Sequence, residues 1–182
     1  MFNKRAASAK SKPDEILTAL KLKPGQKIAD IGSGGGYFTL HFAEAVGSEG
    51  RVFAVDNNPE YLALVQRNAS AKGMNNIKLV DIGKEGQRLP DSFFDLIFFR
   101  NVFHHLEDRI NLMKEYRKKL KPEGRIAIIE YLPGRGGIFS FRRLFGHNVP
   151  KEKIIAEMEQ AGYKKNEEFD FLPEQSFVLF HP

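Results

Sequence analysis

The chain has 182 residues, of which 42% are hydrophobic and 28% charged, as in ordinary globular proteins, so we expect one folded domain over residues 1–182. It contains no cysteine, which excludes disulfides, thiolate metal ligands and cysteine nucleophiles. The net charge of +5 favours acidic partners but identifies none.

Residues 1–12 form a basic arm without an acidic residue. No apolar run approaches the roughly 20 residues of a membrane-spanning helix, and the first residues lack the apolar core of a signal peptide. We therefore expect a cytoplasmic protein with no membrane span.

Beyond the arm, apolar strand patterns alternate with amphipathic helical patterns. Fully apolar strands alternating with helices predict an α/β fold, with a doubly wound, mostly parallel sheet and helices on both faces. The predicted helices begin at Pro13 and cover 37–46, 59–72 and 106–120, and the predicted strands cover 27–31, 51–56, 77–80, 94–99 and 125–130.

The last third of the chain departs from this alternation. A glycine-rich stretch begins at Gly134, and a helix is predicted over 150–160. Two apolar strands over 168–172 and 176–180 are separated by only three residues, which requires an antiparallel hairpin. The stretch 134–147 is interpreted either as a mobile lid over an acceptor or as a crossover packed on the sheet.

A glycine cluster follows the first strand and precedes a helix. Asp30 lies at the strand end, and Gly32 and Gly34 stand where the backbone must turn sharply and leave room for a ligand. Nucleotide-like ligands bind at the carboxyl ends of such strands. A flexible loop without a ligand is the alternative interpretation.

Acidic residues also end the second and third strands. Asp56 is placed to accept hydrogen bonds from ribose hydroxyls. Asp81 is placed to accept one from an adenine amino group while Ile82 or a neighbour packs on the ring, and capping a helix or turn is the alternative role of Asp81.

The glycine spacing disfavours phosphate-containing cofactors. A dinucleotide fingerprint requires Gly or Ala at position 37 or 39, which are Tyr37 and Thr39, and no Walker motif occurs. A carboxylate such as Asp30 suits a cationic amino group better than a pyrophosphate.

Four motifs resemble class I S-adenosylmethionine-dependent methyltransferases, most closely the small-molecule group that includes ubiquinone and menaquinone biosynthesis methyltransferases. They are DIGSGGG at 30–36, VD at 55–56, NVFHHLED at 101–108 and KLKPEG at 119–124. The resemblance spans about Gln26 to Phe180 and implies a seven-stranded Rossmann-like sheet with an antiparallel last strand. The chain lacks the larger insertions that often cap the substrate pocket in that family.

The resemblance also implies S-adenosylmethionine as the cofactor. The residues expected to bind it are Asp30, Gly32, Ser33, Gly34, Tyr37, Asp56, Asn57, Asp81, Ile82, Arg100 and Asn101.

Methyl transfer by in-line displacement depends mainly on alignment, so a general base is optional. His104 and His105 are the candidate catalytic residues that would orient or deprotonate an acceptor, and packing or capping is their alternative role.

A small organic acceptor is favoured. Methylation at pyrimidine C5 or of arsenic normally uses cysteine, and residues 100–104 read RNVFH instead of the NPP-type motif of amino-group methylases. Arg100 also stands where a catechol-type site would place a carboxylate, so no metal is expected. The alternatives are an RNA or protein methyltransferase that uses the basic residues, a non-catalytic S-adenosylmethionine-binding protein and, least favoured, an NAD-dependent oxidoreductase.

Overall fold

The computed structural model describes residues 11–83, 89–133 and 148–182. Most of the basic arm (residues 1–10) and the whole 134–147 stretch lie outside the described residues. The interpretations placed on these two stretches therefore remain predictions.

A seven-stranded sheet with strand order β3-β2-β1-β4-β5-β7-β6 forms the centre of the fold. Strands β1 to β5 are parallel, whereas β7 runs antiparallel to both β5 and β6. The predicted doubly wound sheet with an antiparallel C-terminal hairpin is confirmed. The strands are β1 (Lys27–Ile31), β2 (Arg51–Asp56), β3 (Ile77–Asp81), β4 (Phe94–Arg100), β5 (Leu120–Tyr131), β6 (Lys164–Phe169) and β7 (Gln175–His181).

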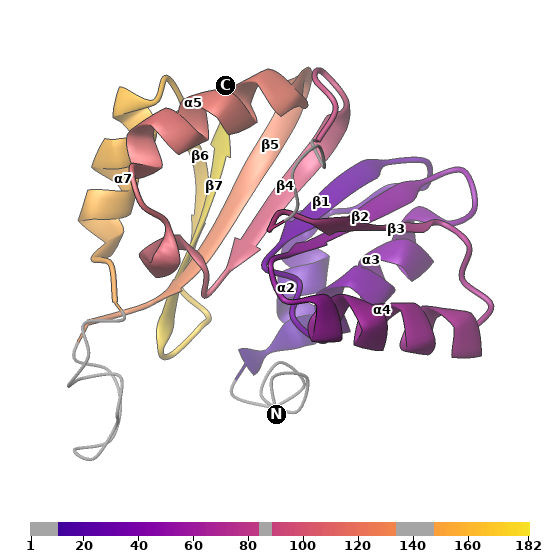
Figure 1. Ribbon diagram of the computed structural model, residues 1–182. Coiled ribbons are helices and arrows are strands. Elements are labelled where there is room, and N and C mark those ends of the chain that lie inside the picture. Colours follow the sequence, from indigo (N-terminus) through magenta and orange to yellow (C-terminus); the bar gives the residue numbers. More distant parts are fainter. Residues whose placement is uncertain (1–10, 84–88, 134–147) are drawn as a thin grey trace.

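Helices cover both faces of the sheet (Figure 1). On one face, α2, α3 and α4 pack against β1 to β3 and their neighbours; on the other, α5 and α7 pack together over β5 and β6. These elements are α2 (Pro13–Leu20), α3 (Tyr37–Val46), α4 (Pro59–Ala71), α5 (Arg109–Lys119), α7 (Lys151–Gln160) and the short 3-10 helix η2 (Phe103–His105). Among the helices described, none is long and apolar enough to cross a bilayer.

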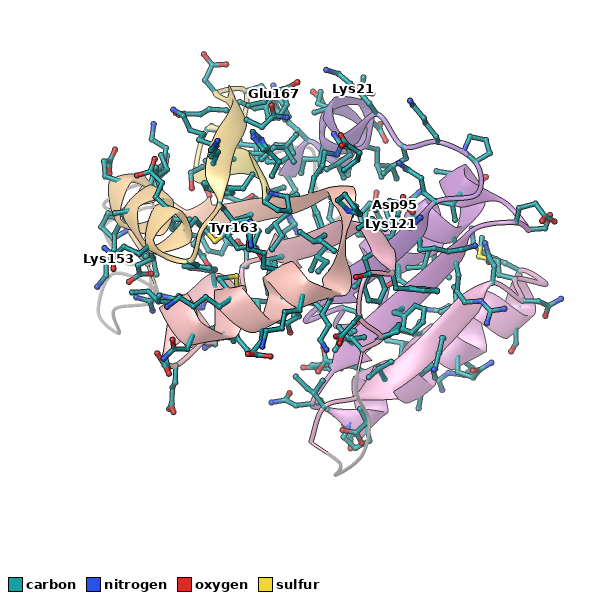
Figure 2. All side chains as sticks on the ribbon, turned by 90° about the horizontal axis from the view of Figure 1, so that it is seen from above. Lys21, Asp95, Lys121, Lys153, Tyr163 and Glu167 are labelled. Atoms are coloured by element: carbon teal, nitrogen blue, oxygen red, sulfur yellow. The ribbon has the colours of Figure 1, made fainter. Side chains whose placement is uncertain are left out.

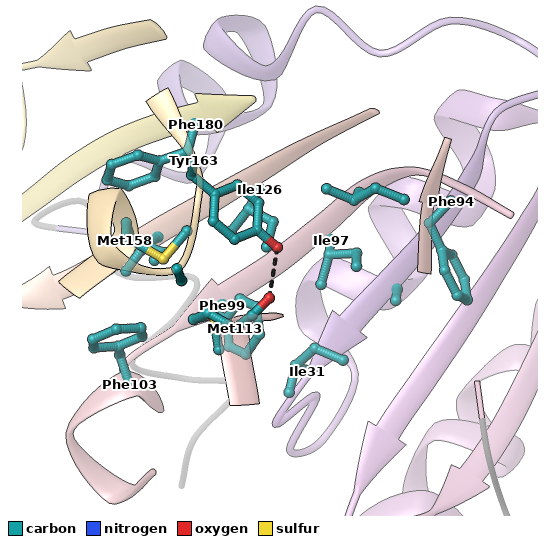
Figure 3. Packing of buried hydrophobic residues seen from close by; sticks show 14 of the residues in the cluster. Ile31, Phe94, Ile97, Phe99, Phe103, Met113, Ile126, Met158, Tyr163 and Phe180 are labelled. Carbon is teal, nitrogen blue, oxygen red and sulfur yellow. Dashed lines mark hydrogen bonds between the residues drawn. The ribbon is translucent and has the colours of Figure 1, made fainter. Parts of the chain in front are cut away.

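Alternate residues of each strand point to opposite faces, which divides the core into two apolar layers. Phe98 of β4 packs with Phe38 and Phe42 of α3 on one face. On the other face, Phe99 lies in the cluster that contains Met113 of α5. Figure 3 shows that layer, in which the buried Tyr163 hydroxyl donates a hydrogen bond to the Met113 carbonyl at 2.9 Å.

Three predicted elements differ from the structure. Strand β5 begins at Leu120 instead of at 125, because Leu120 already pairs with Phe94 of β4. Helix α5 begins at Arg109 instead of near 106, because Phe103 is buried in the core and winds 103–105 into a separate 3-10 turn. Strand β6 covers Lys164–Phe169 instead of 168–172. The side chains of β6 are mostly exposed, so the sequence carries no apolar pattern that predicts a strand there. The strand is held by main-chain hydrogen bonds to β7 at the edge of the sheet.

Asp95 joins three strands at the amino edge of the sheet (Figure 2). Near the start of β4, it accepts a hydrogen bond from the backbone N–H of Lys27 at 2.7 Å and pairs with the Lys121 ammonium at 2.8 Å. These contacts fix the starts of β1, β4 and β5, while the predicted site residues lie at the opposite, carboxyl edge. Lys21, which follows α2, pairs with Glu167 of the edge strand β6 at 3.4 Å.

Candidate functional site at the carboxyl edge

The glycine loop folds back over the end of β2. The backbone N–H groups of Gly32 and Ser33 both donate to the Val55 carbonyl, at 2.8 and 3.1 Å. Gly34 and Gly36 have φ values of +52° and +81°, in the left-handed region that favours glycine. The loop therefore turns tightly into the N-terminus of α3.

Gly32 also lies in contact with the segment that follows β4. It has a φ of +69°, and a Cβ added there would stand 2.3 Å from Cγ2 of Val102. Val102 directly precedes η2, so the glycine loop packs against the turn that carries the two candidate histidines. This contact explains why the first glycine of the loop has no room for a side chain.

The Asp56 carboxylate holds the glycine loop in place. Its Oδ2 accepts a hydrogen bond from the Gly34 N–H at 2.8 Å, and its Oδ1 accepts one from the Asn58 N–H at 2.9 Å. Each carboxylate oxygen retains a lone pair after these bonds, so the buried Asp56 keeps capacity for hydroxyl donors of a ligand. Asn57, between the two contacts, is exposed at the same edge.

Asp81 lies beside Asp56 in the register of β2 and β3. Its Oδ1 accepts a hydrogen bond from the Gly83 N–H at 2.9 Å, as expected of a turn-capping acid. Ile82, the next residue, is 51% exposed, which makes it the one large hydrophobic side chain left mostly exposed in the described part of the chain. An apolar surface and a carboxylate thus stand side by side.

Asp30, at the end of β1, is a buried acid with few partners of opposite charge. Its Oδ2 accepts a hydrogen bond from the Thr39 hydroxyl at 2.5 Å. Burial raises the pKa of Asp30 from 3.8 to about 7, and the nearby Asp56 charge adds to this; the Thr39 hydrogen bond and Arg100 act in the opposite direction. A ligand cation placed here would favour the ionised carboxylate.

The loop also contains a buried hydroxyl group that has no hydrogen-bond partner among the described residues. Ser33 Oγ is buried, and nothing within the described residues makes a hydrogen bond to it. Buried hydroxyl groups are normally paired. Together with the spare lone pairs of Asp56, this atom indicates that a polar ligand fits against the loop.

Tyr37, the first residue of α3, lies next to the loop with its ring 4.7 Å from that of His41. Burial and the charge of Asp14 raise the pKa of Tyr37, while Arg100 lowers it. The Tyr37 side chain is therefore bordered by α2 on one side and by the end of β4 on the other.

A polar network joins the end of β4 to the C-terminal hairpin. The Arg100 guanidinium stacks on the Phe38 ring at 5.1 Å and donates from Nη2 to Gln175 Oε1 at 3.4 Å. Gln175 Nε2 donates to Asn101 Oδ1 at 2.5 Å. Strand β7 thus fixes the two residues expected to border the ligand.

His104 contacts a buried acid at the end of β5. Its Nδ1 lies 2.9 Å from Oε2 of Glu130, and its backbone N–H donates to the same oxygen at 3.2 Å. The Glu130 side chain is fully buried, and that of His104 is 7% exposed. His105 is exposed, and its ring stacks on His104 with the centroids 4.0 Å apart.

The structure brings all the predicted site residues to one edge of the sheet, in three adjoining parts. The glycine loop and the acids of β1 and β2 form the first, Asp81 and Ile82 the second, and residues 100–105 the third. Sequence reasoning missed Thr39, Glu130 and Gln175. Glu130 ends a predicted strand, so the rule that selected Asp56 would have found it, whereas nothing in the sequence pairs Gln175 with Asn101.

Comparisons with known proteins agree with this architecture. A family model described as a methyltransferase domain matches residues 22–171. Demethylmenaquinone methyltransferase of Geobacillus stearothermophilus is 27% identical over 131 residues, covering 72% of this chain and 55% of that protein. Phosphoethanolamine N-methyltransferase 1 of Zea mays is 30% identical over 150 residues, covering 82% and 27%. The chain thus spans less than two thirds of the length of these relatives.

Solved structures share the fold. A crystal structure of a SAM-dependent methyltransferase from Aquifex aeolicus superposes with a TM-score of 0.84 at 21% identity, covering 98% of this chain and 95% of that one. A methyltransferase from Mesorhizobium loti gives a TM-score of 0.74 at 18% identity, with 94% and 97% covered. At these identities the likeness concerns the fold.

We expect Gly32→Ala to destabilise the protein more than Gly73→Ala. The two glycines have similar φ values, +69° and +65°, but a Cβ at Gly73, which follows α4, meets nothing within 4 Å. Both substitutions carry the left-handed cost of roughly 1–2 kcal/mol, and Gly32→Ala adds about 1–3 kcal/mol of overpacking against Val102. Urea unfolding measures the difference.

The double variant Gly32→Ala/Val102→Ala provides the control, because Val102→Ala removes the atoms that a Cβ at position 32 would meet. After the destabilisation caused by Val102→Ala alone is subtracted, the double variant should be less destabilised than Gly32→Ala. Equal losses for Gly32→Ala and Gly73→Ala would show that the contact with Val102 is unimportant.

Asp30→Asn should stabilise the protein at neutral and alkaline pH. The pKa of Asp30 is about 7 in the folded protein and 3.8 in the unfolded chain. The protonated Asp30 therefore contributes fully to the free energy of unfolding below pH 4, and this contribution is lost as the pH rises through about 7. The amide stays neutral and still accepts from Thr39. At pH 8 we expect a gain of at most about 4 kcal/mol, at roughly 1.4 kcal/mol per pKa unit.

The comparison of wild type and Asp30→Asn by urea unfolding at several pH values measures this gain. The advantage of Asp30→Asn should shrink toward zero between pH 7 and pH 4. A constant difference across that range would mean that Asp30 does not titrate there.

Proposed function

Since the chain belongs to the family of methyltransferase domains, whose methyl donor is S-adenosylmethionine, we propose that it transfers that methyl group to a small organic acceptor. The donor would bind along the carboxyl ends of β1, β2 and β3. The acceptor would lie beyond the end of β4.

One observation carries this proposal. Asp30, Asp56 and Asp81 end three adjacent strands, and Asp56 holds the glycine loop between them. Three acids at one edge would repel the phosphates of a dinucleotide or of ATP, whereas a nucleoside with a cationic amino acid end carries no phosphate to repel. The charge pattern therefore favours S-adenosylmethionine over NAD.

Each part of the donor has a group that suits it. Asp56 would accept hydrogen bonds from the ribose hydroxyls, and Asp81 with the exposed Ile82 would hold the adenine ring. Asp30 would face the amino group, and Arg100 the carboxylate, of the methionine part. The cation would keep Asp30 ionised, so its binding would release a proton below pH 7.

S-adenosylmethionine supplies an electrophilic methyl group on a sulfonium, and the chain contributes mainly alignment and exclusion of water. Asn101 would border the reacting centre, held by Gln175. His104 and His105 stand four and five residues beyond the end of β4 and are the candidates for contact with the acceptor.

A small acceptor is proposed for two reasons. The names of two relatives refer to the methylation of demethylmenaquinone and of phosphoethanolamine, both small molecules. Residues 100–104, after β4, read RNVFH instead of the NPP-type motif of amino-group methylases of adenine or glutamine.

We expect S-adenosylhomocysteine, the demethylated product, to raise the melting temperature, while NADH and ATP leave it unchanged. A ligand that binds the native state adds RT ln(1 + [L]/Kd) of stability, about 2.7 kcal/mol at a hundredfold excess over Kd. Thermal unfolding with each ligand in turn measures the shift. An equal shift with NADH would contradict the proposed cofactor.

Asp56→Ala should weaken the binding of S-adenosylhomocysteine by about 1.5–3 kcal/mol, because it leaves the ribose hydroxyls and the Gly34 N–H without their charged acceptor. Isothermal calorimetry measures the affinity. Asp95→Ala is the matched control, since Asp95 also accepts from a backbone N–H but at the amino edge. Unchanged affinity in a folded Asp56→Ala protein would assign Asp56 a structural role only.

A further inference from the structure

Glu130 is a buried acid that the binding of the methyl donor does not require. It is the last but one residue of β5, its side chain is fully buried, and the four residues before it, 126–129, are apolar and buried. Burying a carboxylate costs several kcal/mol unless hydrogen bonds compensate. The contacts of Glu130 therefore indicate what it does.

Within residues 11–83, 89–133 and 148–182, the side chain of Glu130 contacts N–H groups and the imidazole of His104. Glu130 Oε1 accepts from the Tyr131 N–H at 2.8 Å, and Oε2 accepts from the His104 N–H at 3.2 Å. The remaining partner is Nδ1 of His104, at 2.9 Å. A carboxylate that accepts at both oxygens requires a donor at Nδ1, which places the imidazole proton there.

We propose that Glu130 is a positioning residue that holds His104 with its proton on Nδ1, so that Nε2 is the general base for the acceptor. This inference rests on the proposed methyl transfer. It distinguishes His104 from its neighbour and indicates the class of acceptor.

The surroundings of the two histidines differ in the way this role requires. Phe103, fully buried in the core (Figure 3), anchors η2 next to His104. The backbone N–H of His104 donates to Glu130. His105 is exposed, and its ring leans on that of His104. A base must keep a fixed direction toward the proton it removes, and His104 is the one held at both main chain and ring.

The turn also lies in the correct place. Val102 packs on Gly32 of the glycine loop, so η2 adjoins the loop against which the donor would bind. Glu130 and Arg100 lie at the ends of neighbouring strands, since Arg100 pairs with Ile129. The base and the donor site thus share one edge of the sheet.

The proposed transfer moves one proton and one methyl group. Nε2 of His104 takes the proton from an acceptor group X–H, the X–H electron pair forms the bond to the methyl carbon, and the electrons of the broken carbon–sulfur bond stay on sulfur. The imidazolium that results is stabilised by the Glu130 carboxylate and then loses its proton to water. The products are X–CH₃, S-adenosylhomocysteine and a proton.

This arrangement favours acceptors whose nucleophile appears only on deprotonation. A phenol, an enol or a carbon acid needs the base before or during attack, whereas a neutral amine attacks through a lone pair that it already has. We therefore assign the acceptor to the class of phenolic hydroxyls and acidic carbons.

The tautomer of His104 tests the proposal without an acceptor. Long-range ¹H–¹⁵N correlation spectra of protein labelled in the histidine rings, recorded at pH 8, should give His104 the signature of a protonated Nδ1 and an unprotonated Nε2. His104→Gln assigns the signals. A His104 protonated on Nε2 would overturn the proposal, and this measurement needs only the wild-type fold.

Glu130→Gln should reverse or equalise that preference, because its amide can donate to Nδ1. His105→Ala is the matched control and should leave the His104 signals in the same tautomer. An unchanged tautomer in folded Glu130→Gln would mean that Glu130 does not position the ring.

Turnover gives the second readout, with a tritiated methyl donor and three probes: a simple phenol, a 1,3-diketone and an aromatic amine, which is neutral at the pH of the assay. Glu130→Gln and His104→Gln should lower kcat for the phenol or diketone at least about tenfold, within the range of general-base effects, and leave the affinity for S-adenosylhomocysteine unchanged. Methylation of the amine alone would overturn the assigned acceptor class. Failure of the wild type to bind S-adenosylhomocysteine would instead contradict the proposed function and leave the tautomer result standing.

Discussion

The two hydrogen bonds accepted by Asp56 are the interaction on which the site depends. One reaches the Gly34 N–H in the glycine loop, and the other reaches the Asn58 N–H, whose side chain in turn caps α4 by accepting from the Glu60 N–H at 2.9 Å. The main chain of Asp56 also accepts from the Ile82 N–H at 3.1 Å. One residue at the end of β2 thus sets the loop after β1, the start of α4 and the turn after β3.

Burying charged groups at this edge lowers the stability of the fold unless hydrogen bonds or opposite charges compensate for the lost hydration. The raised pKa of Asp30 is one expression of that cost. Glu130 and Arg100 meet it with hydrogen bonds and, for Arg100, with the Phe38 ring. Such groups concentrate where parallel strands end, because the helices leave the carboxyl edge uncovered and main-chain turns there offer donors. The opposite edge uses its charges in pairs, as Asp95 and Lys121 do.

Much of the fold follows from local pattern. Apolar runs such as 51–56 and 94–99 can be buried on both faces only inside a parallel sheet, and a three-residue gap can join only antiparallel strands. The pattern failed at β6, where polar side chains are exposed and the strand is held by its main chain. It also failed at the start of α5, because burial of Phe103, a tertiary effect, decides where the helix begins.

The sequence by itself determined the α/β class, the position of the glycine loop and the acids at the ends of the first three strands, because these depend on periodicity and on residues at strand ends. The tertiary structure decided which distant groups meet there. Gln175 reaches Asn101 only because β7 inserts beside β5, and Glu130 reaches His104 only because β5 lies next to β4. No local pattern encodes such pairs, since their partners are 26 to 74 residues apart and meet through strand order.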